Sequence, residues 1–179
     1  MKRTAIVLAS VSIVFMAGGC VSRLAKEGLG AVQGGKGRAQ ETLAPTTPLG
    51  MYGNIEVGQF TNSFGGPTPG GFLGALPGQI TAALRDKELP VGGSGKTLQV
   101  RGDVIYYETA PATGQIFGPL EEAIANVQLV DKASGKVVAH ACCVGRSTST
   151  SSQGTGSKAA GLGKAIAGWI AKHSPKATE

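Results

Sequence analysis

The stretch AIANVQLVDKASGKVVAHACCVG, residues 123–145, decides the fold. Every second residue of its first part is apolar: Ala123, Ala125, Val127 and Leu129. This alternation predicts a strand over residues 123–130 with one buried face. The segment DKASGK at 131–136 has the composition of a tight turn, with Gly135 where positive φ is needed. Residues 137–145 then return as a partner strand, so the stretch predicts an antiparallel hairpin.

Two further strands are expected before this hairpin. In TLQVRGDVIYYET, residues 97–109, strict alternation places one set of residues on the same face: Leu98, Val100, Gly102, Val104 and Tyr106. Gly102 interrupts the apolar set, so we expect the strand to bend there. A shorter alternating segment at residues 55–61 predicts another strand.

Helical spacing appears twice. Residues 158–173 carry an apolar stripe at i, i+3, i+4, i+7 and i+8, formed by Leu162, Ala165, Ile166, Trp169 and Ile170. Residues 74–89 predict a second helix, whose regular part should start near Leu76 because Pro77 is tolerated only in a first turn. The expected fold is α+β: a mainly antiparallel sheet of about four strands with two helices on one face, in the order β-α-β-β-β-α.

The N-terminal residues have the three-part layout of a secretory signal. Lys2 and Arg3 are followed by a short apolar run at residues 5–15 and then by Met16-Ala17-Gly18-Gly19-Cys20. The apolar run is too short for a membrane-spanning helix. The ending resembles the bacterial lipoprotein box, although Ala17 stands where Leu is usual. The alternative is an ordinary secretory signal with an incidental cysteine.

The lipoprotein-box resemblance implies that Cys20 is acylated, carries palmitate-type chains and becomes the mature N-terminus. It also implies sorting to the outer membrane, since Val21 is not Asp. We therefore expect a lipid-anchored protein on the periplasmic face of the bacterial outer membrane. The expected organisation is a signal peptide at 1–19, a lipidated N-terminus and flexible linker at 20–49, an α+β envelope domain at 50–174 and a tail at 175–179. The linker is expected because residues 21–48 are rich in Gly, Ala, Gln, Thr and Pro and lack sustained periodicity.

Charge and composition exclude several classes of partner. The chain of 179 residues has a formal charge of +6, but its Lys and Arg residues are scattered and no aromatics are interleaved with them, so no nucleic acid is expected. The loop at residues 93–97 reads GSGKT, yet Pro90 stands where a phosphate-binding loop needs its first Gly. The same loop follows a predicted helix and precedes a predicted strand, whereas a phosphate-binding loop follows a strand and precedes a helix. No nucleotide is therefore expected.

Cys142 and Cys143 are the most reactive residue types in the predicted hairpin. Adjacent strand residues point to opposite faces, which favours one buried and one exposed thiol. A disulfide, either vicinal or intermolecular, stays open as an alternative in an oxidising compartment. A metal site with His140 lacks further ligands at suitable spacing. No nucleophile, base and orienting group converge either, so we expect no enzyme, no catalytic residue, no cofactor and no metal.

The apolar stripe of the last helix has two interpretations. Leu162, Ile166, Trp169 and Ile170 could anchor the helix to the sheet or form a partner-binding surface. The glycines at 161, 163 and 168 would permit close packing against the sheet or against a second copy of the chain.

From Tyr52 to Ser174 the layout resembles a family of small bacterial envelope lipoproteins with a domain of unknown function. The resemblance rests on QFTN at 59–62, LRD at 84–86, LQVRG at 98–102, the hairpin VDKASGKVVA at 130–139 and the amphipathic C-terminal helix. More distantly, the pattern is similar to the α/β module of the curli-secretion lipoprotein, the amino-terminal domain of the Tol translocation protein and the lipoprotein activators of penicillin-binding proteins. This resemblance implies a non-catalytic binding or assembly module of the cell envelope. Its expected partners are the membrane, through Cys20, and either another envelope protein or further copies of itself.

Overall fold

The computed structural model describes residues 36–66, 71–108, 122–147 and 155–174. Within these ranges it contains the strands β1 (Lys36–Leu43), β2 (Asn54–Asn62), β3 (Thr97–Tyr107), β4 (Glu122–Asp131) and β5 (Val137–Arg146). The helices are α2 (Phe72–Asp86) and α3 (Thr155–Lys172), with a short 3₁₀ helix, η1 (Leu49–Met51).

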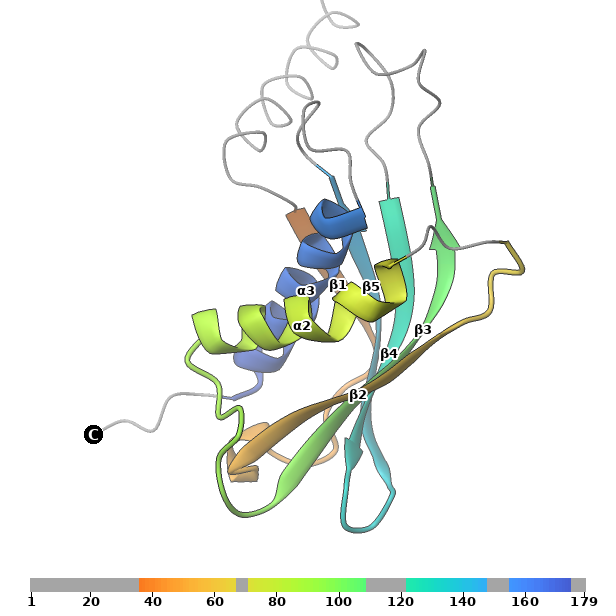
Figure 1. Ribbon diagram of the computed structural model, residues 1–179. Coiled ribbons are helices and arrows are strands. Elements are labelled where there is room, and N and C mark those ends of the chain that lie inside the picture. Colours follow the sequence, from red (N-terminus) through yellow and green to blue (C-terminus); the bar gives the residue numbers. More distant parts are fainter. Residues whose placement is uncertain (1–35, 67–70, 109–121, 148–154, 175–179) are drawn as a thin grey trace, which may run out of the picture.

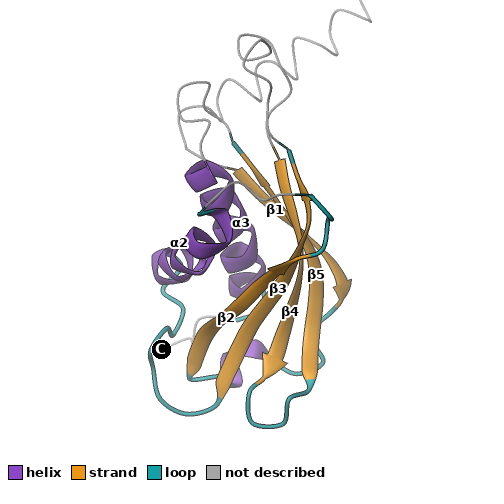
Figure 2. Ribbon diagram, turned by 45° about the vertical axis from the view of Figure 1, so that its right-hand side comes forward, coloured by secondary structure: helices purple, strands orange, loops and turns teal. Residues whose placement is uncertain are grey.

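The five strands form one sheet in the order β1-β5-β4-β3-β2. All neighbouring pairs are antiparallel except β2 and β3, which are parallel. Both helices lie on the same face of the sheet, with α3 crossing behind α2 (Figures 1 and 2). The expected α+β fold with a mainly antiparallel sheet and two helices on one face is confirmed, and the described sheet has one strand more than expected.

The additional strand is β1, in a segment where the sequence predicted a flexible linker. That prediction was wrong for residues 36–43, which pair with β5 and therefore belong to the folded domain together with its expected part from residue 50. The inward-facing residues of β1 are Gly37, Ala39 and Glu41, so the strand lacks the apolar alternation that identifies a buried strand. The expected signal peptide at 1–19, the residues 20–35 and the tail at 175–179 lie outside the described residues.

The core lies between the inner face of the sheet and the two helices. Its largest fully buried aliphatic side chains come from both layers: Leu76, Ile80, Leu84, Leu98, Val100, Val104, Leu129, Leu162, Ile166 and Ile170. Full burial of each such side chain contributes about 1.5–3 kcal/mol. Helix α2 begins at Phe72, earlier than expected, and holds Pro77 within its length. Pro77 removes one intrahelical hydrogen bond and crowds the carbonyl of Leu73, and the burial of Leu76, Ile80 and Leu84 in α2 offsets this cost.

The sequence predicted a bend of β3 at Gly102, and the pairing of β3 with its two neighbours is irregular in two places. A Cβ at Gly102 would overlap the ring of Phe60, so this glycine makes room for a core side chain. The register with β2 shifts next to Gly102, between Val57 and Phe60, and the register with β4 shifts between Val104 and Tyr106. Tyr106 therefore lies opposite Ile124, on the face away from the helices, and is 43% exposed. Tyr107 turns inward and packs edge-on against Phe72, with a centroid distance of 4.8 Å.

The β4–β5 hairpin is organised by the carboxylate of Asp131. Its Oδ1 accepts hydrogen bonds from the backbone N–H groups of Ala133 (3.1 Å) and Ser134 (3.0 Å). Its Oδ2 accepts a hydrogen bond from the Tyr52 hydroxyl at 3.2 Å. Gly135 has φ 70°, as the turn requires. The backbone hydrogen bond from Ser134 is the main cause that lowers the pKa of Asp131 to about 2, against the opposing effect of burial.

Helix α3 approaches the backbone of β1 and β5 very closely. A Cβ at Gly37 would overlap the carbonyl oxygen of Gly161. A Cβ at Gly145 would lie 2.6 Å from the carbonyl oxygen of Lys158, and one at Gly161 would lie 2.8 Å from that of Lys36. Glycines at these crossing points therefore set the distance between helix and sheet.

The side chain of Lys158 is buried at the start of α3, where it is 1% exposed. Its Nζ donates a hydrogen bond to the Glu108 carbonyl at 2.6 Å and lies 4.0 Å from the Tyr107 ring centroid.

We expect Gly161→Ala to destabilise the protein by about 1–2 kcal/mol, because the overpacking cost exceeds the gain in helix propensity. Gly168→Ala, in the same helix, is the matched control. An added Cβ there meets nothing within 4 Å, so this substitution should stabilise by up to about 1 kcal/mol. Urea unfolding of both variants measures the difference. Equal shifts of the same sign would contradict the close helix–sheet approach.

Asp131→Asn should reduce stability at neutral pH and much less at low pH. The pKa of Asp131 is about 2 when folded and near its usual 3.8 when unfolded, so its charged form stabilises the fold above pH 4. This contribution is lost as the pH falls toward 2. Denaturant unfolding across this range should show the wild-type and variant curves converging in acid. Asp86→Asn, which removes an exposed carboxylate at the end of α2, is the control.

Candidate functional site

The candidate site is the face of the sheet turned away from the helices. No element in the described ranges lies over this face (Figure 2). Two grooves are hollowed into it, and apart from the backbone of Gly37 and Gly102 both are lined by side chains that point away from the core. A surface of this kind offers contacts to a partner and leaves the core intact.

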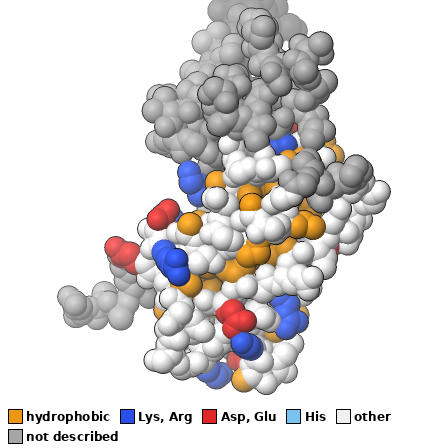
Figure 3. Space-filling model, viewed as in Figure 1, with side chains coloured by type: hydrophobic (Ala, Val, Ile, Leu, Met, Phe, Trp, Pro, Cys, Tyr) orange, Lys and Arg blue, Asp and Glu red, His pale blue; other side chains and the backbone are white. Residues whose placement is uncertain are grey.

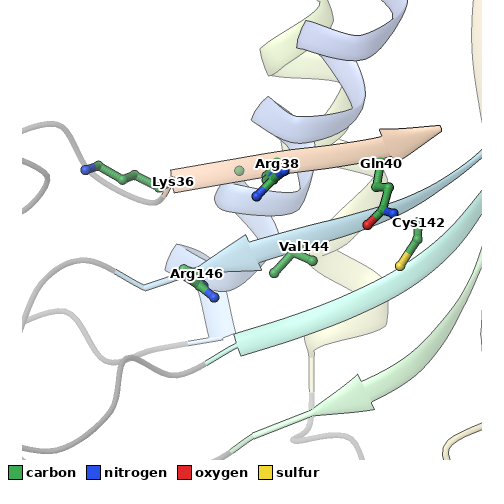
Figure 4. Close-up of a pocket in the computed structure, with 7 residues that line it drawn as sticks. Lys36, Arg38, Gln40, Cys142, Val144 and Arg146 are labelled. Atoms are coloured by element: carbon green, nitrogen blue, oxygen red, sulfur yellow. The ribbon is translucent and has the colours of Figure 1, made fainter. Parts of the chain in front are cut away.

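The first hollow, here named the β1–β5 groove, has a volume of about 360 Å³ (Figure 4). Its lining residues are Lys36, Gly37, Arg38 and Gln40 from β1 and Cys142, Val144 and Arg146 from β5. The antiparallel register brings them together by pairing Lys36 with Arg146, Arg38 with Val144 and Gln40 with Cys142. Arg38 and Arg146 thus lie near Val144, and Cys142 lies beside Gln40 at the other end of the groove (Figure 4). Arg146 also forms an ion pair with Glu122, its neighbour on β4.

The second hollow, here named the central groove, is larger, with a volume of about 680 Å³. It is lined by Gln59, Thr61, Gln99, Arg101, Gly102, Asp103, Asn126, Gln128 and His140. Several of these polar groups bond to one another: Arg101 Nε donates to Gln99 Oε1 at 2.6 Å, and Thr61 donates to Asp103 at 2.7 Å. Its carboxamides and hydroxyls suit hydrogen bonding to a polar partner.

The two cysteines of β5 lie on opposite faces, and both are free thiols. Cys143 is fully buried in the core, and desolvation, with a smaller effect of Cys142, raises its pKa to about 12. Cys142 is half-buried and lines the β1–β5 groove. No bridge joins the two within the chain. An intermolecular bridge through Cys142 stays a prediction.

The residues that might have formed a catalytic pair line different grooves, although His140 and Cys142 lie two residues apart on the same face of β5. His140 lines the central groove, whereas Cys142 lines the β1–β5 groove. The Nδ1 of His140 is hydrogen-bonded to the hydroxyl of Thr42, and Glu121 lies outside the described residues. In the described ranges, no group of three His, Cys, Asp or Glu side chains is placed to hold a metal ion.

Of the two interpretations of the apolar stripe on the last helix, the structure favours the anchor to the sheet over the partner-binding surface. Leu162, Ile166 and Ile170 are fully buried, and Trp169 is 4% exposed. Their stripe packs against the sheet and α2, so it anchors the helix and offers nothing to a partner. Gly161 and Gly163 are likewise used inside the chain, against the backbone of β1 and α2.

The end of α3 holds β1 through Glu41. Lys172 Nζ lies 2.9 Å from Glu41 Oε1, and His173 Nε2 lies 2.8 Å from Glu41 Oε2. The hydrogen bond from Lys172 is the main cause that lowers the pKa of Glu41, and Trp169 and His173 add to it. Sequence reasoning missed this cluster because Glu41 and Lys172 are far apart along the chain.

Cys20, the expected lipidation site, lies outside the described residues. None of the described helices is both long and apolar enough to cross a membrane.

Alkylation should distinguish the two thiols of β5. In a Cys20→Ala background, iodoacetamide should modify Cys142 in the native protein and spare Cys143, because Cys143 is buried and its pKa is raised to about 12. In urea both should react. Fragment-ion mass spectrometry assigns the label to one residue or the other, and Cys142→Ser should abolish native labelling. Comparable native labelling of Cys143 would contradict the strand orientation.

Comparison with known proteins finds similarity in structure. No protein-family model matches the chain, and no curated protein matches its sequence. A PelC dodecamer from Paraburkholderia phytofirmans aligns with a TM-score of 0.53 at 14% identity, covering 75% of this chain and 96% of that chain. A variant of the same protein, also a dodecamer, aligns with a TM-score of 0.52 at 15% identity and the same coverage. A Xanthomonas campestris protein described with family DUF330 gives a TM-score of 0.41 at 18% identity, covering 74% of this chain and 87% of that chain. The described domain therefore shares its fold with PelC.

Proposed function

We propose that this chain is a lipid-anchored protein of the bacterial outer membrane whose domain assembles with copies of itself. In this proposal the domain is a non-catalytic binding or assembly module on the periplasmic face. The anchor rests on the lipoprotein-box resemblance that ends at Cys20. The observation that carries self-assembly is the likeness to PelC, since the aligned region spans 96% of a chain that is described as a dodecamer.

The described sheet supports this proposal through its two edges. Strands β1 and β2 are its outer strands. Residues 90–91 cover only the start of β2, through the bridge between Ile55 and Val91. Closed rings of identical subunits need two different surfaces that fit each other, and two dissimilar sheet edges can supply them.

Apolar surface near β2 is a second supporting feature. Figure 3 shows apolar side chains gathered between α2 and β2. Val57 of β2, Phe64 just after it and Leu73 of α2 are partly buried and pack against the core. Apolar surface beside an open strand edge is typical of a contact between subunits.

Native mass spectrometry of the lipidated protein in detergent tests this proposal. We expect an oligomer of defined stoichiometry that persists in reducing agent and in Cys142→Ser. Leu73→Gln should weaken the oligomer, because this change makes the apolar surface beside β2 polar. Met51→Gln is the control, since Met51 is exposed in η1 and does not belong to the set of Val57, Phe64 and Leu73 that forms this surface. The thermal unfolding of both variants checks that each still folds.

Crosslinking in cells, with Cys20→Ala alongside, tests the anchored state. Self-crosslinks that depend on Cys20 agree with the proposal. A monomer at high concentration, together with one dominant crosslinked foreign protein, would replace self-assembly with an adaptor that binds another envelope component. A Cys20→Ala protein that stays in the membrane would contradict the anchor.

A further inference from the structure

The two edge strands of the described sheet run in opposite directions. β2 is parallel to β3, and each step from β3 to β4, from β4 to β5 and from β5 to β1 reverses the direction. β1 therefore runs antiparallel to β2, although about 19 Å separates these strands within one chain (Figure 1). A rotation about an axis along the strands keeps their directions, so it brings β2 of a second copy antiparallel to β1. Antiparallel pairing, the more stable kind, is thus available between successive copies.

Both edges keep backbone groups open to such a partner. Within the described ranges, no strand pairs with the outer side of β1, and only residues 90–91 reach the outer side of β2, at Ile55. The register of β1 with β5 is regular over residues 36–41. Beyond the covered start of β2, its register with β3 is regular over residues 60–62. These regular parts present the backbone best suited to a new ladder.

Opposite charges lie beside these regular parts on the open face of the sheet. Antiparallel alignment of the two parts places Arg38 of one copy beside Thr61 of the next. Thr61 donates a hydrogen bond to Asp103, its partner on β3, at 2.7 Å. Arg38 is exposed and Asp103 is half-buried, and neither forms an ion pair with another described residue. The long guanidinium side chain of Arg38 can reach a carboxylate one strand further on, so the two edges are complementary in charge.

We propose that β1 of one copy pairs antiparallel with β2 of the next copy, with Arg38 facing Asp103 across the contact. This inference rests on the proposed self-assembly and deepens it, because it assigns the contact, its direction and its charge pair. The same contact places the apolar surface of Val57, Phe64 and Leu73 next to the neighbouring copy's α3, which covers β1. The sheet and the helix layer therefore continue from copy to copy.

The features of these edges also have a plain structural explanation. Bulges and charged side chains on edge strands discourage pairing with other molecules. The register of β1 shifts between Glu41 and Leu43, and that of β2 shifts between Val57 and Phe60. If these features only protect the edges, reversing an edge charge leaves the assembly unchanged.

Charge reversal in the full-length lipidated protein, in detergent, tests the charge pair. We expect Arg38→Asp and Asp103→Arg each to raise the protein concentration needed for half-assembly about tenfold, because each change sets like charges against each other. The double variant should restore assembly, since opposite charges then face each other again. Lys136→Asp, in the hairpin at the opposite end of β5, is the matched control and should leave assembly unchanged. Native mass spectrometry over a dilution series measures all of these variants.

A disulfide gives a second readout that does not depend on charge. With Arg38→Cys and Thr61→Cys combined in a Cys142→Ser background, oxidation should link successive copies into a covalent ladder. The two edges of one sheet lie too far apart for a bridge within the chain. Either new cysteine alone should give no ladder. Circular dichroism checks that each variant folds, and this cysteine pair keeps the test decisive if Asp103→Arg does not fold.

Several results would overturn the inference. One is an assembly that is insensitive to both charge reversals, and another is a double variant no better assembled than the single variants. Covalent dimers from Arg38→Cys alone would indicate two-fold pairing of β1 with itself instead. A wild-type protein that stays monomeric at high concentration refutes the proposed self-assembly, whereas an oligomer that ignores the reversals refutes only the edge contact.

Discussion

The structure depends on how closely α3 lies against β1 and β5. Gly37, Gly145 and Gly161 meet at this crossing, and an added Cβ at each of them would collide with backbone atoms. Such contact brings the apolar stripe of α3 down onto the sheet, where Leu162 and Ile166 are fully buried. The close contact with α3 also holds β1 in the sheet, although β1 has little apolar surface of its own. The high glycine content of the chain is thus partly a consequence of packing a helix directly onto strand backbone.

The open face of the sheet follows from this arrangement. Because both helices occupy one side, the opposite side keeps its polar residues, and the position of β1 beside β5 brings Arg38 next to Val144. If β1 were a loose tether, the β1–β5 groove would not exist. The same strand therefore completes the described sheet and places Arg38 and Gln40 beside β5.

Local patterns predicted much of this fold. The alternation in residues 123–130, the turn with Gly135 and the stripe around Trp169 each specified an element that the structure contains. Strand β1 could not be predicted in this way, because its inward residues are glycine, alanine and a glutamate that needs Lys172 and His173 as partners. The β1–β5 groove could not be predicted either, because only the pairing of β1 with β5 brings Arg38 next to Val144. The stripe itself was found, but sequence alone could not say that the core covers it.

Hydrogen exchange of the backbone amides in residues 36–43 tests the account most directly. If β1 is an integral strand held by α3 and Glu41, its amides that bond to β5 should exchange as slowly as the amides within β5 itself. Gly161→Ala should accelerate exchange in β1 more than in the β3–β4 pair. Rapid exchange throughout residues 36–43, with slow exchange in β5, would show that this segment is not held in the sheet, and the assignment of residues 36–43 to the folded domain would have to be abandoned.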